Sequence, residues 1–305
     1  MKFSDCDKKM RVYEESLDQI IPPEVYIVAR LDGRSFTRLT KQTLDLEKPF
    51  DIRFRDAMVY TVVRLMNAGF RVVYGYTQSD EISLLLHLDA DTFSRKVRKL
   101  NSLLAAEASV AFSIRMSIEA CFDCRIVPLP NWNLVEDYFL WRQDDAHRNS
   151  LNSYCYWTLR ADGLSPADAN KRIKGINNAD KNELLFQHGI NYNNIPAWQK
   201  RGIGVYLEDI PVEGRNPLTG EVRQSIRHRL FVNYELPIGD EYRKMLTEVT
   251  KWDYQNRVRR HSAPYLSCLL LHLFVDLLPN LFFGMSSDDT ANHAMASFLP
   301  LVSSK

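Results

Sequence analysis

Cysteine is scarce in this chain, and its few copies are scattered. The 305 residues contain five cysteines, which are Cys6, Cys121, Cys124, Cys155 and Cys268. Their odd number and irregular spacing argue against a disulfide framework. Cys121 and Cys124 form a lone CxxC pair with no second pair nearby, which favours buried thiols over a zinc or redox site.

An excess of charge of either sign is also missing. The chain has 39 Lys and Arg against 38 Asp and Glu, a net charge of +1. It therefore has no general attraction for nucleic acid, and RNA binding would have to come from local basic patches. With 45% hydrophobic and 25% charged residues, the composition is that of an ordinary soluble protein long enough for a large core.

Long hydrophobic runs are limited to one segment. The N-terminus lacks the apolar core of a signal peptide and shows no lipidation pattern, so we expect a cytoplasmic protein. Residues 263–283 are apolar but are interrupted by His272, Asp276 and Pro279. These interruptions favour a buried or subunit-contacting helix over a membrane span, and no membrane partner is expected.

Two β-rich segments, residues 25–36 and 71–86, each deliver carboxylates at a turn. The first provides Asp32, and the second provides Asp80 and Glu81. Hard cations such as Mg²⁺ prefer oxygen ligands, and two such ions about 4 Å apart can activate a hydroxyl and neutralise a triphosphate. Asp-Gly and Ser-Asp-Glu are equally good plain turns, so these residues alone leave both interpretations open.

The order of elements predicts an α+β fold. A helix over residues 8–20 precedes a strand over 25–31, and Asp51 is expected to cap a helix ending near residue 69. A hairpin over 71–86, a helix over 93–116 and a strand over 122–127 follow. This order is typical of a ferredoxin-like or polymerase-palm antiparallel sheet, and we assign residues 1–130 to a palm-like catalytic domain.

The rest of the chain is expected to add helices and a hairpin arm. Residues 131–236 would complete the nucleotide and tRNA site, and residues 237–305 would form a C-terminal helical segment. Strands over 203–207 and 228–233 form the expected arm. Four helices are predicted, over residues 134–143, 149–161, 166–173 and 181–188, and Ser165 is expected to cap the third.

Six sequence blocks occur in an order that resembles one family. They are RLDGRSFTRL, KPFD, YGYTQSDEISLLL, DYFLWRQDDAHRNSLNSYCYW, ADKNELLF and INYNNIP. Over residues 3–204 the chain resembles the tRNA-His guanylyltransferases and their guanylyltransferase-like relatives, which extend RNA in the 3′-to-5′ direction. Several ordered blocks are more specific than any single motif.

The resemblance implies roles for named residues. Asp32, the Gly33 carbonyl and Asp80 would hold two Mg²⁺ ions, with Asp32, Asp80 and Glu81 as catalytic residues. Because neighbouring strand residues point to opposite faces, Glu81 is expected to orient the site rather than to ligate a metal. The implied nucleotide-binding residues are Arg30, Asp32, Gly33, Arg34, Ser35, Phe36, Thr37, Lys48, Ser79, Asp80, Lys99 and Arg125. For Phe36, contact with a base and a place in the core under the loop remain equal alternatives.

A second set would hold tRNA or a second nucleotide. It comprises His147, Asn149, Lys181, Asn191, Asn193 and Asn194. Further cations for the RNA backbone are Arg223, Arg227, His228, Arg229, Arg257, Arg259 and Arg260. The resemblance also implies ATP and GTP, or other nucleoside triphosphates, as substrates, tRNA as partner and a homotetramer.

One block departs from the family pattern His-Ile-Asn-Asn-Leu-Tyr-Asn. His147, Asn149 and Leu151 match it; Arg148, Ser150, Asn152 and Ser153 do not. These departures favour templated repair of 5′-shortened tRNA, with ATP activation of a 5′-monophosphate, over guanosine addition to tRNA-His. Two other hypotheses stay open: a cyclase-like palm enzyme without an RNA substrate, and a non-catalytic tRNA-binding protein.

Overall fold

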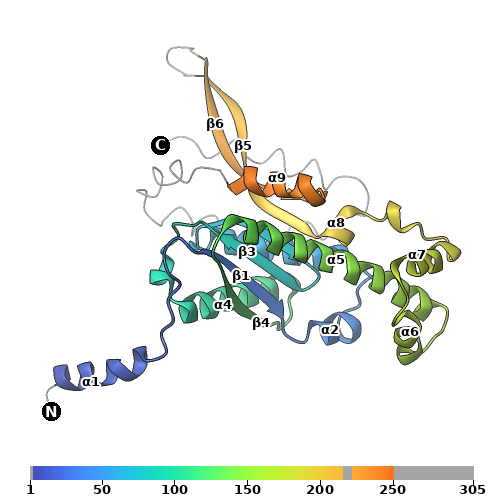
Figure 1. The fold of residues 1–305 in the computed structure, drawn as a ribbon, viewed down its shortest axis with the longest axis horizontal. Helices are drawn as coiled ribbons and strands as arrows, with labels where there is room; N and C mark the ends of the chain where they lie inside the picture. The colour runs from blue at the N-terminus through green and yellow to red at the C-terminus, as the bar shows by residue number, and fades with distance from the viewer. Residues whose placement is uncertain (1–2, 216–221, 251–305) are drawn as a thin grey trace. The chain divides into compact units, whose positions relative to one another are not determined.

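The computed structural model describes residues 3–215 and 222–250 (Figure 1). They belong to one compact unit that ends at Trp252. The apolar segment over residues 263–283, Cys268 and most of the predicted C-terminal segment lie outside the described residues. In the described part of the chain, no helix is long and apolar enough to cross a membrane.

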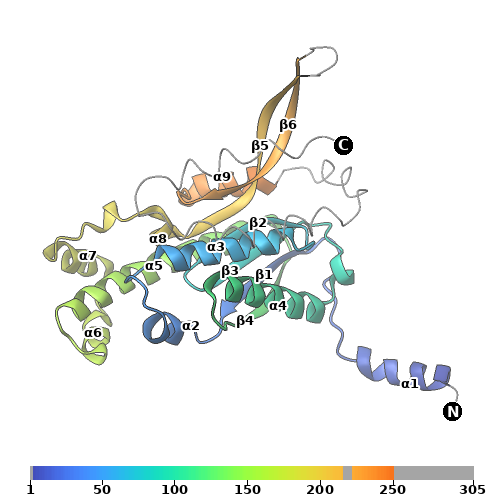
Figure 2. The ribbon, with the colours of Figure 1, turned by 180° about the vertical axis from the view of Figure 1, so that it is seen from behind.

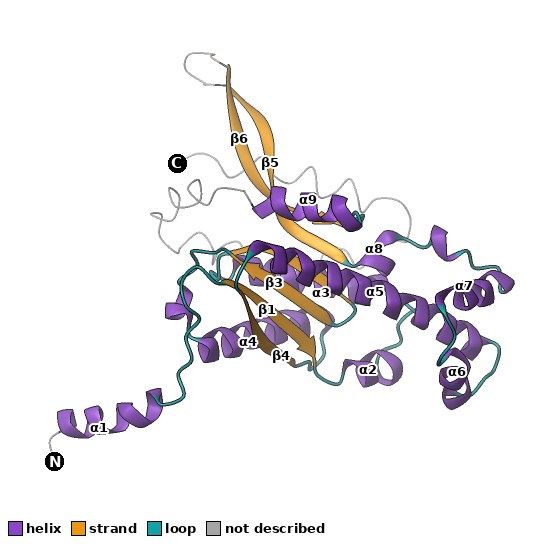
Figure 3. Cartoon of the chain, viewed as in Figure 1, coloured by secondary structure: helices purple, strands orange, loops and turns teal. Residues whose placement is uncertain are grey.

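The centre of this unit is an antiparallel sheet with strand order β4-β1-β3-β2-β5-β6. The predicted α+β fold is therefore confirmed, and the predicted hairpin arm, β5 with β6, continues the same sheet through the pairing of β2 with β5. Both arm strands are longer than expected (Figure 3). The strands are β1 (Tyr26–Gly33), β2 (Val72–Gln78), β3 (Glu81–Leu86), β4 (Phe122–Leu129), β5 (Ile203–Arg215) and β6 (Val222–Asn233).

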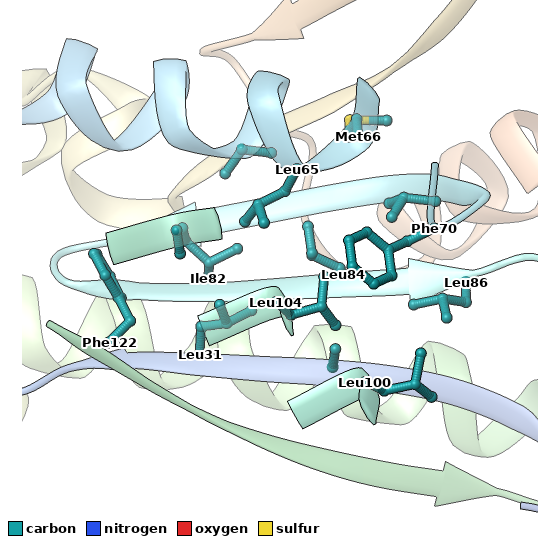
Figure 4. Packing of buried hydrophobic residues seen from close by; sticks show 14 of the residues in the cluster. Leu31, Leu65, Met66, Phe70, Ile82, Leu84, Leu86, Leu100, Leu104 and Phe122 are labelled. Carbon is teal, nitrogen blue, oxygen red and sulfur yellow. The ribbon is translucent and has the colours of Figure 1, made fainter. Parts of the chain in front are cut away.

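Helices α3 (Ile52–Asn67) and α4 (Val97–Met116) cover one face of the sheet (Figure 2). Between them and the strands lies the largest apolar cluster, which includes Leu31, Leu65 and Leu104 (Figure 4). The Asp51 side chain accepts a 2.7 Å hydrogen bond from the Arg53 N–H, which confirms the predicted cap of α3. The next helix begins four residues later than predicted, because residues 93–95 have positive φ values.

Helices α5 (Trp132–Ala161) and α9 (Gly239–Thr250) pack on the opposite face. The prediction of two separate helices at 134–143 and 149–161 was wrong, because α5 runs unbroken for 30 residues. Its buried side continues through Ala146 and Ser150, and Asp145 forms ion pairs one turn away in each direction, with Arg142 and Arg148. These contacts stabilise the stretch for which a break was expected.

The remaining elements surround this layered core. The predicted N-terminal helix lies at α1 (Phe3–Glu15) and has no buried residue, so its apolar positions do not pack on the sheet. The Ser165 cap predicted for α6 is confirmed, since its hydroxyl oxygen accepts from the Asp168 N–H. The short elements are α2 (Phe36–Arg38), η1 (Leu39–Thr43), η2 (Thr92–Arg95), α6 (Pro166–Ile173), α7 (Asn178–Gln187), η3 (Tyr192–Asn194) and α8 (Ala197–Arg201).

Candidate nucleotide and metal site

The two carboxylate-bearing turns meet at one end of the sheet. Asp32 at the end of β1 is paired in register with Glu81 at the start of β3. The Gly33 N–H donates a 3.0 Å hydrogen bond to the Asp80 carbonyl oxygen. Ser79, which precedes Asp80, is in the left-handed region with φ 50°. The structure thus brings Asp32, Gly33, Asp80 and Glu81 together.

Asp80 is the most perturbed carboxylate of this group. Burial raises its pKa to about 6, and the nearby charge of Asp32 adds to the rise, while a hydrogen bond from the Ser79 hydroxyl at 3.1 Å opposes it. Burial and a second carboxylate nearby both make the charged form of Asp80 costly, and a bound cation would offset that cost. Within residues 3–215 and 222–250, no group of three or more His, Cys, Asp or Glu side chains could hold a metal. Two carboxylates with backbone and phosphate oxygens are a donor set of the kind that Mg²⁺ takes, and metal binding by Asp32 and Asp80 stays a prediction.

Glu81 lies on the side of the sheet covered by α5 and is tied to two arginines. Arg30 Nη2 donates a 2.5 Å hydrogen bond to Glu81 Oε1, and Arg142 Nη2 lies 3.6 Å from Glu81 Oε2. The sequence assigned Arg30 to phosphate binding and did not single out Arg142. In the structure both guanidinium groups face Glu81.

A cavity of about 210 Å³ opens beside Asp80. Its walls come from the loop after β1, the segment before α3, the end of β2, α5 and α8. Five of the residues proposed for nucleotide binding line it: Phe36, Thr37, Lys48, Ser79 and Asp80. The cavity therefore gathers residues from three of the sequence blocks around one space.

Two lysines and several aromatic rings shape this cavity. Lys48 Nζ donates a 2.6 Å hydrogen bond to the Thr40 carbonyl oxygen and lies 5.6 Å from the centre of the Trp157 ring. Burial lowers the Lys48 pKa. Lys41 also lines the cavity, and Phe50 and Trp198 contact each other edge to face at 5.9 Å. The sequence analysis did not single out Lys41, Trp157 or Trp198. Trp157 lies on α5 and Trp198 on α8, and only the fold brings these helices to the loop.

Phe36 supports the loop from below. Its side chain is 2% exposed, and its ring lies 5.0 Å from the rings of both Phe112 and Phe122. A Cβ atom on Gly33 would come within 2.5 Å of that ring. Of the two roles left open by the sequence, the structure favours the place in the core.

The other seven residues proposed for nucleotide binding are not part of the cavity lining: Arg30, Asp32, Gly33, Arg34, Ser35, Lys99 and Arg125. Arg34, Ser35, Lys99 and Arg125 are exposed. Arg125 lies 4.0 Å from Asp123 on the same strand. Their assignment to nucleotide binding stays a prediction.

The second predicted set lies around Tyr192. The His147 ring contacts the Tyr192 ring edge to face at 5.5 Å, and burial lowers the His147 pKa. Asn191 and Asn193 line a depression of about 530 Å³ between α7 and η3. Asn149 instead donates to Asp145 at 3.3 Å. Lys181 on α7 and Asn194 in η3 complete the set near this depression.

Two basic residues of the arm contact acidic residues across the hairpin. His228 Nδ1 lies 2.7 Å from Asp209 Oδ1, and Arg229 Nη2 lies 3.0 Å from Glu208 Oε1. Residues 257, 259 and 260 lie outside the described part of the chain, as does the Arg223 side chain. The predicted contact between this arm and an RNA backbone stays a prediction.

Comparisons with known proteins point to one family. The family model described as tRNAHis guanylyltransferase matches residues 7–130, and that of the Thg1 C terminal domain matches residues 133–252. A protein of Mus musculus named probable tRNA(His) guanylyltransferase is 36% identical over 247 residues, covering 74% of this chain and 82% of its own length. One of Dictyostelium discoideum, named likewise, is 30% identical over 250 residues, covering 78% and 96%.

Solved structures agree with these matches. A bacterial tRNA(His) guanylyltransferase-like protein in complex with GTP superposes with a TM-score of 0.63 and 29% identity, over 81% of this chain and 99% of that one. Its complex with ATP gives 0.62 and 27%, over 80% and 99%. The tRNA(His) guanylyltransferase of Saccharomyces cerevisiae gives 0.59 and 29%, over 63% and 90%.

Proposed function

The chain belongs to the tRNA-His guanylyltransferase family of nucleotidyltransferases, and we propose that it adds nucleotides to the 5′ end of tRNA in the 3′-to-5′ direction. The observation that carries this proposal is the junction of Gly33 with Asp80. It brings Asp32 near Asp80, and Asp80 lines a cavity together with two lysines. This combination suits a nucleoside triphosphate, whose phosphates need cations and whose base needs an apolar wall.

Asp32, Asp80 and the Gly33 carbonyl would hold Mg²⁺. When bound, the ions would supply charge neutralisation at the phosphates and lower the pKa of the attacking hydroxyl. Lys41 and Lys48 would face the triphosphate and offset its charge. Asp80 must lose its proton to act as a ligand, and its raised pKa means that this loss occurs near pH 6 in the metal-free chain.

The reaction joins a nucleotide to the RNA by a displacement at phosphorus. The 3′-hydroxyl oxygen of the nucleotide forms a bond to the 5′ phosphorus of the RNA, its proton is released, and pyrophosphate leaves if that end is a triphosphate. A 5′-monophosphate would first displace pyrophosphate from ATP. The resulting adenylylated end would then lose AMP when the hydroxyl attacks.

The RNA would be held around His147 and Tyr192. The depression lined by Asn191 and Asn193 adjoins this pair and can offer amide donors and acceptors to an RNA end or a second nucleotide. Because Arg148, Ser150, Asn152 and Ser153 depart from the family pattern, we propose repair of 5′-shortened tRNA in preference to guanosine addition to tRNA-His. A homotetramer in the cytoplasm would supply a larger RNA-binding surface, and light scattering of the full chain tests the tetramer.

The experiment is incorporation of labelled nucleotides into a tRNA lacking its first 5′ nucleotide, beside full-length tRNA-His, with Mg²⁺. We expect the wild type to extend the truncated RNA with the complementary nucleotide, and Asp80→Ala to abolish extension. A preference for guanosine on full-length tRNA-His would instead indicate guanosine addition to tRNA-His as the activity. Consumption of triphosphate without extension of either RNA would contradict the proposal and favour a cyclase-like reaction.

A further inference from the structure

Glu81 sits beside the proposed metal ligands but is held by two cations from different elements. One carboxylate oxygen accepts from Arg30 on β1 at 2.5 Å. The other lies 3.6 Å from Arg142 on α5. Both oxygens of Glu81 are thus directed to guanidinium groups on the α5 side of the sheet.

Arg142 is an unusual group to find in this position. Its side chain is among the most buried in the chain, at 1% exposed. It pairs with Asp145 one turn along α5 and lies 4.2 Å from the centre of the Trp141 ring. Its Nε atom is buried with no hydrogen-bond partner. Burying a guanidinium in this way contributes little or nothing to stability compared with an apolar side chain, which suggests a role other than stability.

That role follows from the pairing of the strands. Glu81 is opposite Asp32 in the β1–β3 register and follows Asp80 directly. Without a cationic partner, its carboxylate would add a third negative charge to this end of the sheet and be free to turn toward it. Arg30 and Arg142 together remove both effects, and Arg142 is the partner that is fixed by burial in a long helix.

We propose that Arg142 is a positioning residue, which fixes and neutralises Glu81 so that Asp32 and Asp80 keep the geometry needed for nucleotide addition. This inference rests on the proposed function. Arg142 acts through Glu81, because the contacts found for it are with Glu81, Asp145 and the Trp141 ring. Asp145 also contacts Asn149, so the same ion-pair group connects the catalytic carboxylates to the proposed RNA-contacting turn of α5.

The chain offers a matched control in Arg243 on α9. This residue also pairs with a carboxylate of α5, Asp137, but 36% of its side chain is accessible and it lies outside the Glu81 ion pairs. The comparison is of Arg142→Gln with Arg243→Gln in single-turnover extension of the truncated tRNA. Arg142→Gln should lower the rate constant by about tenfold or more, as expected for loss of a supporting group, with the nucleotide KM within about twofold. Arg243→Gln should stay within about twofold of the wild type for both.

A double-mutant cycle separates positioning from a merely structural role. If Arg142 acts through Glu81, adding Arg142→Gln to Glu81→Gln should lower the rate little further, by about twofold at most. Arg142→Lys keeps the positive charge at this position and should recover part of the rate. If Arg142→Gln does not fold, Arg142→Lys takes its place in the cycle. If the two substitutions act independently, so that their effects on the rate multiply, or if the Arg142 and Arg243 variants lose the same activity, the inference alone would be overturned. Absence of extension by the wild type would overturn the proposed function as well.

Discussion

The Gly33 N–H and the Asp80 carbonyl oxygen are joined by a 3.0 Å hydrogen bond, although the two residues belong to turns far apart in the sequence. This bond aligns the end of β1 with the turn between β2 and β3. Neither turn alone carries both of the proposed metal ligands. Together they place Asp32 close enough to Asp80 for its charge to raise the pKa of that carboxyl.

Gly33→Ala tests how closely the loop is packed on its core. The added Cβ would lie 2.5–2.7 Å from three Phe36 ring atoms, and Phe36 is enclosed by Phe54, Phe112 and Phe122. We expect a loss of about 1–3 kcal/mol in the free energy of unfolding, as for other overpacked cores, measured in urea. In a Phe36→Leu background the same substitution should cost less. An equal cost in both backgrounds would show that Phe36 does not create the conflict.

Asp80→Asn tests the cost of the buried carboxylate. Since the folded-state pKa is raised to about 6 from 3.8, the folded chain binds the proton more tightly than the unfolded chain. The stabilisation this provides is complete below about pH 4 and is lost as pH rises through 6. At pH 7.5 without metal, the free energy of unfolding of Asp80→Asn, measured in urea, should therefore exceed that of the wild type by about 2–3 kcal/mol.

The difference between the Asp80 variant and the wild type should vanish near pH 4. Adding Mg²⁺ and a nucleoside triphosphate should stabilise the wild type and leave Asp80→Asn largely unchanged. Asp123→Asn, on an exposed part of β4, serves as control and should follow the wild type. A wild type that gains stability between pH 4 and pH 7.5 relative to Asp80→Asn would contradict the prediction.

Trp198→Ala tests the aromatic wall of the cavity. Trp198 contacts Phe50 at 5.9 Å and is braced by Arg55, which lies 5.0 Å from its ring and 4.9 Å from that of Tyr234. Stacking of a base on an aromatic ring contributes about 1–3 kcal/mol, so the nucleotide KM should rise about tenfold with kcat little changed. Phe93→Ala, which removes an exposed ring away from the cavity, should leave both constants unchanged. A selective fall in kcat would argue against a base-binding role.

Arg95→Ala tests a buried cation that joins the N-terminal segment to the sheet. Arg95 donates to the carbonyl oxygens of Ile21, Val25, Leu88 and Ala90 at 2.5–3.0 Å. Its loss would leave four acceptors unsatisfied, so we expect the free energy of unfolding to fall by about 2–4 kcal/mol. Arg98→Ala, which removes an exposed partner of Asp18, should cost less than about 1 kcal/mol. Similar losses in both would contradict this assignment.

The local features could be predicted from the residues alone. Asp51 and Ser165 were predicted as caps because each places a side-chain hydrogen-bond acceptor directly before a helical apolar pattern. The α+β order and the carboxylates at the two turns were predicted from β-rich apolar runs and turn residues. The break expected within α5 was wrong, because local polarity hid a helix whose stability comes from packing of Ala146 and from the Asp145 ion pairs.

The surroundings of those carboxylates depend on the tertiary fold and could not be predicted from local sequence. Trp157 and Trp198 reach the cavity because α5 and α8 fold back over the loop after β1. Arg30 and Arg142 pair with Glu81 because strand register and helix placement bring β1 and α5 to the same carboxylate. Burial and ion pairing depend on residues distant in sequence, so the raised pKa of Asp80 and the clamped state of Glu81 arise only when the chain is folded.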